Sequence, residues 1–160
     1  MILSSLGEVQ PGSLDVVTLF HVLEHLTHPL ESLREIATRL GDAGTVLIEV
    51  PHARDALFTL YDSEPFKAFT FWSEHLVLHT RQSLKILLET AGFEQVEIRG
   101  RQRYPLSNHL HWLARQRPGG HEAWSCLNTT MLHEAYEAAL AGIDRTDTLI
   151  ATTRTPRSRP

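Results

Sequence analysis

The chain has 160 residues, with 15 Lys and Arg against 19 Asp and Glu, and a formal net charge of −4. This length suits one domain, and the mildly acidic balance excludes a nucleic-acid binder that works by bulk positive charge. The single cysteine, Cys126, excludes an intrachain disulfide and a multi-cysteine metal site. No apolar run approaches the roughly 20 residues of a membrane span, and residues 1–8 lack signal-peptide features. We therefore expect a cytoplasmic protein without a membrane or nucleic-acid partner.

The first part of the chain alternates between strand and helix patterns. Residues 15–20 are rich in β-branched and aromatic types and follow a Pro-Gly-Ser turn, which predicts a strand buried on both faces. Residues 29–40 have their apolar side chains on one stripe, which predicts a helix ended by Gly41. Residues 45–50 then predict a second strand, which Pro51 ends.

The alternation continues after an aromatic-rich stretch without a clear period, residues 52–79, in which we expect a lid-like loop. Residues 80–91 predict a helix capped by Thr80, and the alternating residues 93–98 predict a strand near a sheet edge. The remaining segments are, in order, an irregular basic stretch, a helix, a last strand and a disordered tail: residues 100–121, 122–140, 147–153 and 154–160.

Strands joined by helices indicate an α/β fold, in which a mostly parallel sheet has helices on its faces. Ligands of such sheets bind beyond the carboxyl ends of the strands. The segments that follow Phe20 and Val50 are therefore the first places to search for a site.

The segment after the first predicted strand, Phe20-His-Val-Leu-Glu-His25, has three interpretations. His21-x-x-Glu24-His25 matches the inverted zinc-protease pattern, which needs both histidines on one stable helix. The histidines can instead bond to the backbone of a tight turn. The third interpretation, which the topology favours, is a segment that lines a ligand at the carboxyl end of a strand.

Residues 15–29, Asp-Val-Val-Thr-Leu-Phe-His-Val-Leu-Glu-His-Leu-Thr-His-Pro, resemble the fourth strand and the following segment of class I S-adenosylmethionine-dependent methyltransferases. The turn and strand at residues 40–51 and the Ala-Gly-Phe at residues 91–93 agree in order and spacing. The resemblance implies that residues 1–153 are the C-terminal part of a partial Rossmann-like methyltransferase domain, with residues 100–121 as an elaboration. It also implies S-adenosylmethionine as the cofactor and a small-molecule acceptor.

The resemblance implies roles for individual residues as well. Phe20, His21 and Val22 would line the cofactor pocket. The residues that would border the substrate are Glu24, His25, Pro51, His52, Trp72 and Glu74. A histidine beside a hydroxyl acceptor can serve as a general base, and the candidates are His21, His52 and His75. No metal ligand is expected.

A basic stretch gives a second set of candidates. Arg101 and Arg103 either bind an anionic group of the acceptor or belong to a solvated charged face. The full stretch contains Arg99, Arg101, Arg103, Arg115 and Arg117 with His109, His111 and Trp112.

The sequence departs from the family in its cofactor motif. It has no strand followed by a Gly-x-Gly turn and a helix, and no second strand that ends in an acid for the cofactor ribose. We therefore expect this chain alone to be incomplete or inactive as a methyltransferase. Residues 16–20 would then form an exposed sheet edge that pairs with a second copy or with an upstream partner chain. The alternative function is a noncatalytic interaction module that completes its sheet with another chain.

Overall fold

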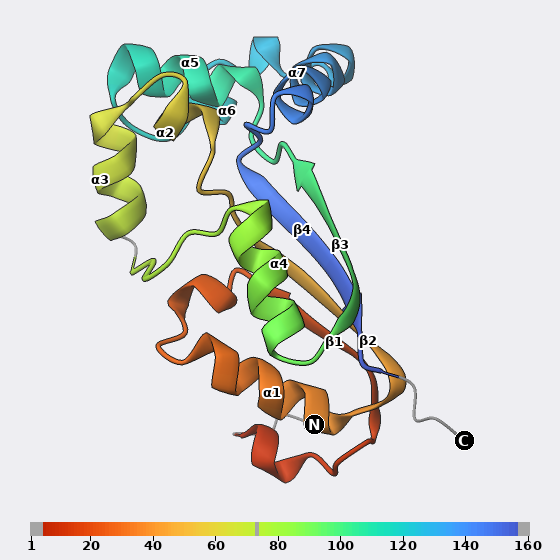
Figure 1. The fold of residues 1–160 in the computed structure, drawn as a ribbon. Coiled ribbons are helices and arrows are strands. Elements are labelled where there is room, and N and C mark those ends of the chain that lie inside the picture. Colours follow the sequence, from red (N-terminus) through yellow and green to blue (C-terminus); the bar gives the residue numbers. More distant parts are fainter. Residues whose placement is uncertain (1–4, 73, 157–160) are drawn as a thin grey trace.

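Residues 5–72 and 74–156 are described by a computed structural model, and within them four strands form one sheet (Figure 1). The order is β1-β2-β4-β3, with β1 at Leu14–Phe20, β2 at Leu40–Pro51, β3 at Glu94–Arg101 and β4 at Thr148–Arg154. β1 and β2 are parallel, whereas β4 is antiparallel to both β2 and β3. Three strands thus share one direction. The expected α/β fold with a mostly parallel sheet is confirmed, and β4 is the exception.

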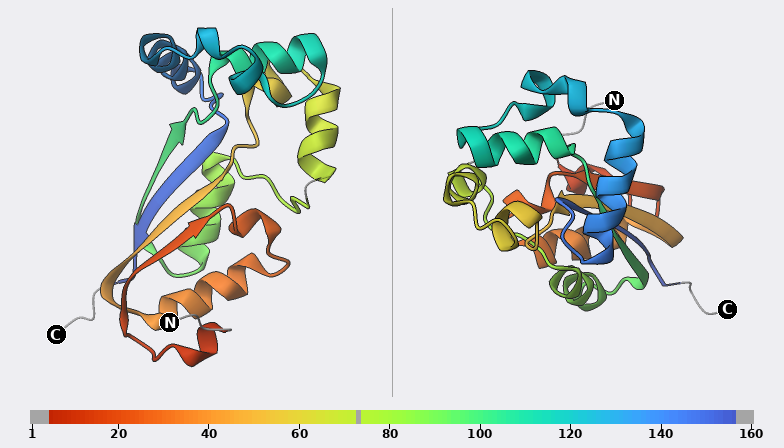
Figure 2. Two further views of the ribbon diagram at one scale, coloured as in Figure 1. Left: turned by 180° about the vertical axis from the view of Figure 1, so that it is seen from behind. Right: turned by 90° about the horizontal axis from the view of Figure 1, so that it is seen from above.

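The helices form two groups around the sheet. α1 and α4 lie against one face, while α2, α3, α5, α6 and α7 gather beyond the ends of β2 and β3 (Figures 1 and 2). Their bounds are α1 Pro29–Arg39, α2 Ala56–Thr59, α3 Glu64–Trp72, α4 Arg81–Thr90, α5 Leu106–Arg115, α6 Gly120–Ala123 and α7 Thr130–Gly142. Three short 3₁₀ helices span Leu6–Glu8, Leu23–His25 and Ser125–Leu127. In the part of the chain described, no helix combines the length and apolar character needed to cross a membrane.

The hydrophobic core lies between the sheet and the two helices on its covered face. Leu33 of α1 and Leu84 and Leu88 of α4 are fully buried against Val46 and Ile48 of β2. Their spacing along each helix places them on one stripe, which is why each helix packs by that side. The core therefore fixes β2 and β4 in the middle of the sheet and leaves their ends free to support a site.

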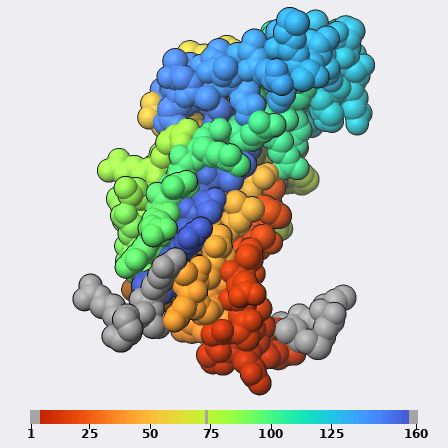
Figure 3. Space-filling model, turned by 90° about the vertical axis from the view of Figure 1, so that its right-hand side faces the viewer, coloured from red at the N-terminus to blue at the C-terminus, as the bar shows by residue number. Residues whose placement is uncertain are grey.

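The opposite face of the sheet has no such cover. Figure 3 shows β3, β4, β2 and β1 side by side over much of this face, without a helix on them. Val16 and Phe20 of β1 are 57% and 52% exposed. The prediction that residues 15–20 are buried on both faces is therefore wrong, because α1 and α4 cover only one. The expected exposed apolar edge is confirmed, since β1 is the end strand of the described sheet.

Local signals placed α4 correctly. The Thr80 side chain accepts from the backbone N–H of Ser83 at 3.1 Å, and the Ser83 hydroxyl bonds in return to the backbone of Thr80. This capping box satisfies backbone donors that have no partner inside the helix. Gly92 follows the helix with a φ of +98°, a conformation that glycine adopts without strain. The chain can therefore turn directly into β3, which lies at the other sheet edge as predicted.

The start of β2 differs from the prediction. β2 begins at Leu40 rather than at residue 45, so Gly41 lies in the strand and does not end the helix. Leu40 is the residue that caps α1, with extended backbone angles. The pairing with β1 shifts between Leu14–Leu40 and Val16–Thr45. The turn expected before residue 45 is thus an irregularity within one long strand.

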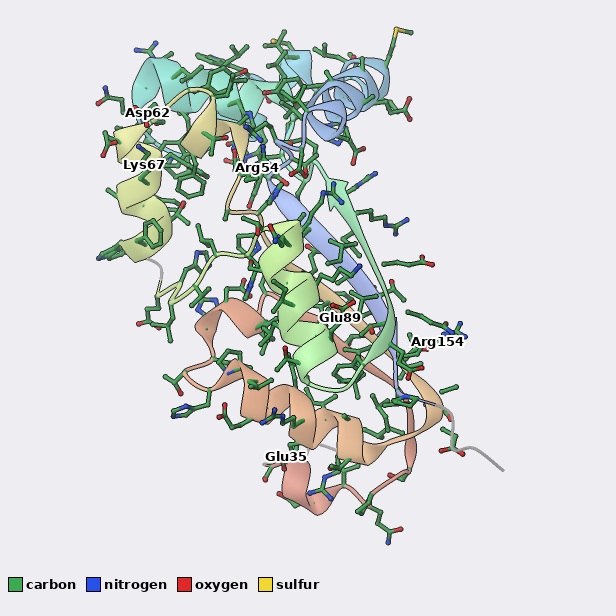
Figure 4. All side chains as sticks on the ribbon, in the orientation of Figure 1. Glu35, Arg54, Asp62, Lys67, Glu89 and Arg154 are labelled. Atoms are coloured by element: carbon green, nitrogen blue, oxygen red, sulfur yellow. The ribbon has the colours of Figure 1, made fainter. Side chains whose placement is uncertain are left out.

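The expected lid-like loop at residues 52–79 contains two helices instead. Asp55 caps α2 by accepting from the N–H of Leu57 at 2.7 Å. Lys67 of α3 pairs with Asp62 just before the helix (Figure 4). Phe58 and Phe66 pack with ring centroids 5.0 Å apart. Helices this short show too few turns for a period in the sequence, which is why the pattern missed them.

The C-terminal expectations also need correction. The stretch at 100–121 contains α5, and the helix expected at 122–140 is broken, because α7 begins only at Thr130 with Thr129 as its cap. Met131, near the start of α7, is 82% exposed. The expected tail starts too early: β4 runs to Arg154, and Thr155 donates to the carbonyl of Gly44 at 2.9 Å. Residues 157–160 lie outside the described part.

Candidate functional site

A cavity of about 270 Å³ lies at the carboxyl edge of the sheet, where the topology predicts a ligand site. Its apolar wall comes from α2, α3 and α5. Trp112 of α5 contacts Phe66 and Phe69 of α3, with ring centroids 5.2 and 5.3 Å apart. Phe58 and Tyr104 also line the cavity. This wall gives the cavity the apolar surface typical of a small-molecule site.

The lining also contains polar side chains, among them two buried acids, Asp55 and Asp147. Burial raises the pKa of Asp55 to about 8, although the hydrogen bond from Leu57 acts against this shift. The negative charge of Asp147 raises it further. Burial also lowers the pKa of the neighbouring His109 to about 4. At neutral pH the cavity lining therefore presents a protonated carboxyl group and a neutral imidazole.

Asp147 positions the segment that brings Arg103 to the cavity. Its carboxylate accepts from the backbone N–H groups of Arg103 at 2.9 Å and Tyr104 at 2.8 Å. It also accepts from the side chain of Gln102 at 2.9 Å. The Arg103 guanidinium reaches the cavity and bonds to the ring of His21. Asp147, a buried acid just before β4, thus positions the backbone just after β3, and with it the Arg103 guanidinium at the cavity.

His21 forms the corner between the cavity and the end of β1. Its φ of +53° makes a sharp turn directly after the strand. Its ring nitrogens lie 3.2 Å from Glu24 Oε1 and 3.0 Å from Glu49 Oε1. The hydrogen bond with Glu24 raises the pKa of His21 above its ordinary value, although burial and the charge of Arg103 oppose this.

Glu24 is completely buried beneath this corner. Burial alone raises the pKa of its carboxyl group, but the hydrogen bond from His21, together with a backbone hydrogen bond and nearby histidine charge, outweighs burial. The pKa of Glu24 therefore lies below its ordinary value, and the group is a carboxylate at neutral pH.

The structure brings some of the expected site residues to the cavity and leaves others outside. The expected residues that line it are His21, Pro51, His52, His75 and Arg103. Trp72 is 83% exposed and Arg101 pairs with Glu137 of α7, and neither lines the cavity. Phe20, Val22, Glu24, His25 and Glu74 also lie outside the lining.

One ring nitrogen of His52 has a hydrogen-bond partner, whereas Nε2 has none among the described residues. Nδ1 lies 2.9 Å from the carbonyl of Thr146, and Nε2 lies 3.8 Å from Asp144 Oδ1. Asp144 also pairs with Arg54, a residue between β2 and α2. Figure 4 labels Arg54 above the upper end of α4. Burial lowers the pKa of His52. This geometry suits a residue that joins the end of β2 to the start of β4.

The zinc-protease interpretation does not fit the geometry. Leu23–His25 is a 3₁₀ helix of three residues, and His21 precedes it in a left-handed turn. His21 and His25 therefore do not share the face of a stable α-helix, which that chemistry requires. Two interpretations of the segment remain: His25 Nδ1 lies 3.0 Å from the backbone carbonyl of Glu74, as in a tight turn, and His21 lines the cavity.

Several lining residues were missed by the sequence analysis. They are Asp55, Leu57, Phe58, Phe66, Phe69, Thr70, Tyr104, Asn108, Pro118, His121, Asp147 and Thr148. Asp55 had a local signal, because an Asp before Ala-Leu-Phe is a typical helix cap. Asp147 had none, since it meets Arg103 and Tyr104 only through the pairing of distant segments.

The residues present supply only part of a wall for S-adenosylmethionine. Phe20 and Val22 expose their side chains at the end of β1, beside His21. Across residues 5–72 and 74–156, no strand leads through a Gly-x-Gly turn into a helix: Gly119 and Gly120 precede the four-residue α6 and follow no strand. The cofactor's close backbone contact therefore has no counterpart in the described residues.

A mostly parallel sheet with one reversed strand and a pocket at its carboxyl edge defines a Rossmann-like α/β protein. The chain matches the methyltransferase domain family over residues 6–98. It therefore belongs to this family, as the resemblance implied.

Solved structures share the fold at low identity. The S-adenosylmethionine-dependent methyltransferase of Archaeoglobus fulgidus has a TM-score of 0.58 and 17% identity, over 94% of this chain and 63% of that one. The phosphoethanolamine N-methyltransferase 2 of Haemonchus contortus, solved with phosphomonomethylethanolamine and S-adenosylhomocysteine, has a TM-score of 0.53 and 17% identity, over 94% and 35%. No match was found among curated proteins.

A third structure is a complex between the Haloferax volcanii Trm112 methyltransferase activator and a protein described as a methyltransferase. Its TM-score is 0.55 and its identity 18%, over 96% of this chain and 58% of that one. This chain thus spans between 35% and 63% of the three structures. The expected cofactor is confirmed at the level of the family, because related structures were solved with S-adenosylmethionine or its product.

Proposed function

We propose that this chain forms the acceptor-binding part of an S-adenosylmethionine-dependent methyltransferase. The observation that carries the proposal is the cavity of about 270 Å³ at the carboxyl edge, which aromatic and polar side chains line together. Methyl transfer depends mainly on holding the reacting atoms about 3–3.5 Å apart. A shaped pocket that excludes water is the main contribution that an acceptor-binding part can make.

The aromatic and the polar side chains of the lining suggest the chemistry of the acceptor. Trp112 and its phenylalanine neighbours suit an apolar ring or chain, while Arg103 supplies a cation for an anionic or polar end. Asp55, protonated at neutral pH, can donate a hydrogen bond to the same end. His21 and His75 line the pocket, and His21 contacts Arg103, whereas His52 has a positioning role in this proposal.

Phenyl phosphate is a suitable probe because it joins a ring to an anion. We expect it to shift NMR signals of Trp112 and Arg103. Arg103→Ala should weaken its binding by about ten- to 150-fold, since a charged hydrogen bond contributes about 1.5–3 kcal/mol. Arg101→Ala is the matched control, because Arg101 pairs with Glu137 outside the cavity. Absence of binding, or equal weakening by both variants, would overturn the proposed pocket.

The cofactor should bind weakly to this chain alone, because the described residues lack its glycine-rich turn. We expect calorimetric titration with S-adenosylmethionine to show no micromolar binding, and no methyl transfer by this chain alone. Micromolar binding would show that the residues present are sufficient and would refute this part of the proposal.

A partner chain is the second part of the proposal, and the exposed β1 edge supports it. Val16 and Phe20 offer apolar surface beside backbone groups that can pair with another strand. In the purified protein the available partner is a second copy, so light scattering should detect a homodimer that Val16→Lys weakens. Leu60→Lys, equally exposed after α2, is the control. A monodisperse monomer would contradict this proposal and the alternative of a module that pairs through β1.

A further inference from the structure

Three side chains of metal-ligand type converge beside the pocket. Glu24 and His25 come from the turn after β1, and His75 comes from the segment after α3. One ligand atom of each lies within 4.8 Å of the others. The Nε2 atoms of His25 and His75 each lie 4.0 Å from Glu24 Oε1. Two imidazoles and one carboxylate form a donor set found in zinc and non-haem iron sites.

The Glu24 carboxylate supports this reading independently. Its Oε1 is near His21, but its Oε2 is buried and has no hydrogen-bond partner in the described residues. A buried carboxylate oxygen without a partner is costly, because it has lost water and gained nothing in return. A cation coordinated by both oxygens of the Glu24 carboxylate would supply the missing partner.

The two histidines are also held in place. His25 Nδ1 lies 3.0 Å from the carbonyl of Glu74, which leaves Nε2 facing Glu24. His75 has a hydrogen bond with the backbone of Thr70. Backbone carbonyls that orient histidine ligands in this way are typical of metal sites.

The backbone joins the two halves of the cluster. The N–H of Leu76 donates to the carbonyl of Glu24 at 2.9 Å, so the segment that bears His75 is tied to the turn that bears the other two ligands. The cluster is therefore not a chance meeting of long surface side chains.

From this geometry we infer that Glu24, His25 and His75 bind a divalent transition-metal cation such as Zn²⁺. The inference differs from the zinc-protease pattern, because His21 bonds to Glu24 and Glu49 and the third ligand is His75. His25 is partly open to solvent, so positions on the cation remain for water or a ligand.

The position of the cation has a consequence for the acceptor, and only this step rests on the proposed function. His75 lines the acceptor pocket, so the cation would lie at the pocket wall. A cation there polarises an oxygen or nitrogen of the bound acceptor, as Lewis-acid sites do.

The test is calorimetric titration of the full chain with ZnCl₂, and Co²⁺ absorption as a second readout. We expect one equivalent of Zn²⁺ at micromolar affinity or tighter, and visible Co²⁺ bands. His75→Gln and Glu24→Gln should each weaken binding at least about tenfold. His28→Ala changes an exposed histidine nearby and should leave binding unchanged.

Absence of stoichiometric binding overturns the inference. Equal weakening by His75→Gln and His28→Ala does so as well, because it would place the cation on surface histidines. If Glu24→Gln fails to fold, the His75→Gln result still decides. The measurement needs no acceptor or methyl donor, so its failure is distinct from a failure of phenyl phosphate to bind.

Discussion

Asp55 gives a quantitative prediction about stability and pH. The folded chain keeps a proton on this carboxyl group up to about pH 8, whereas the unfolded chain releases it near the ordinary value of 3.8. The contribution of this proton to the free energy of unfolding is fully present below pH 3.8. It falls as the pH rises from 3.8 to the pKa of the folded chain, because only the unfolded chain releases the proton in that range. At about 1.36 kcal/mol per pH unit, keeping Asp55 protonated lowers the free energy of unfolding at pH 7 by roughly 4 kcal/mol. Asp55→Asn should remove it, because Asn remains neutral and still accepts from Leu57.

Urea unfolding followed by circular dichroism between pH 5 and pH 8.5 measures this effect. The free energy of unfolding of Asp55→Asn should exceed that of the native chain by an amount that grows about 1.4 kcal/mol per pH unit and levels off near pH 8. Asp147 and Tyr136, which also face Asp55, are present in both proteins, so the difference isolates Asp55. Asp15→Asn, at an exposed position, is the control. Parallel pH curves would refute the reasoning.

Three further predictions concern the fold. Leu84→Ala should lower the free energy of unfolding by about 3 kcal/mol because it leaves a cavity in the core; urea denaturation tests this, and the exposed Ile86→Ala should change little. Thr80→Ala should cost about 1 kcal/mol by removing the cap of α4, and an unchanged urea midpoint would contradict it. Gly92→Ala should cost about 1–2 kcal/mol, because its φ of +98° strains any side chain; thermal unfolding checks the sign.

The elements that sequence reasoning placed correctly carry local signals. Thr80 before a helical stripe and Gly92 after it set the bounds of α4 to within a residue or two. The direction of β4 had no such signal, because alternating or buried residues look the same in parallel and antiparallel strands. The exposed face of β1 was missed for a related reason: its apolar residues do not show which side the helices cover.

The candidate site was predicted in part, at the places where strands end. His21 follows β1 and Pro51 is the last residue of β2, and the carboxyl-edge rule led to both. Arg103 reaches the cavity because Asp147, far along the chain, binds its backbone. His75 joins Glu24 only through the docking of the segment after α3. These contacts form between segments far apart in the chain, and a single sequence does not show which distant segments pack together.

The place of β4 between β2 and β3 has a consequence for how the protein is made. β3 joins the sheet through β4, so β3 and α4 leave the ribosome before their partner strand exists. The nascent chain must hold two open strand edges until Thr148–Arg154 emerges and closes the gap between them. A premature stop codon anywhere before that strand would thus divide the sheet and release a fragment prone to aggregate.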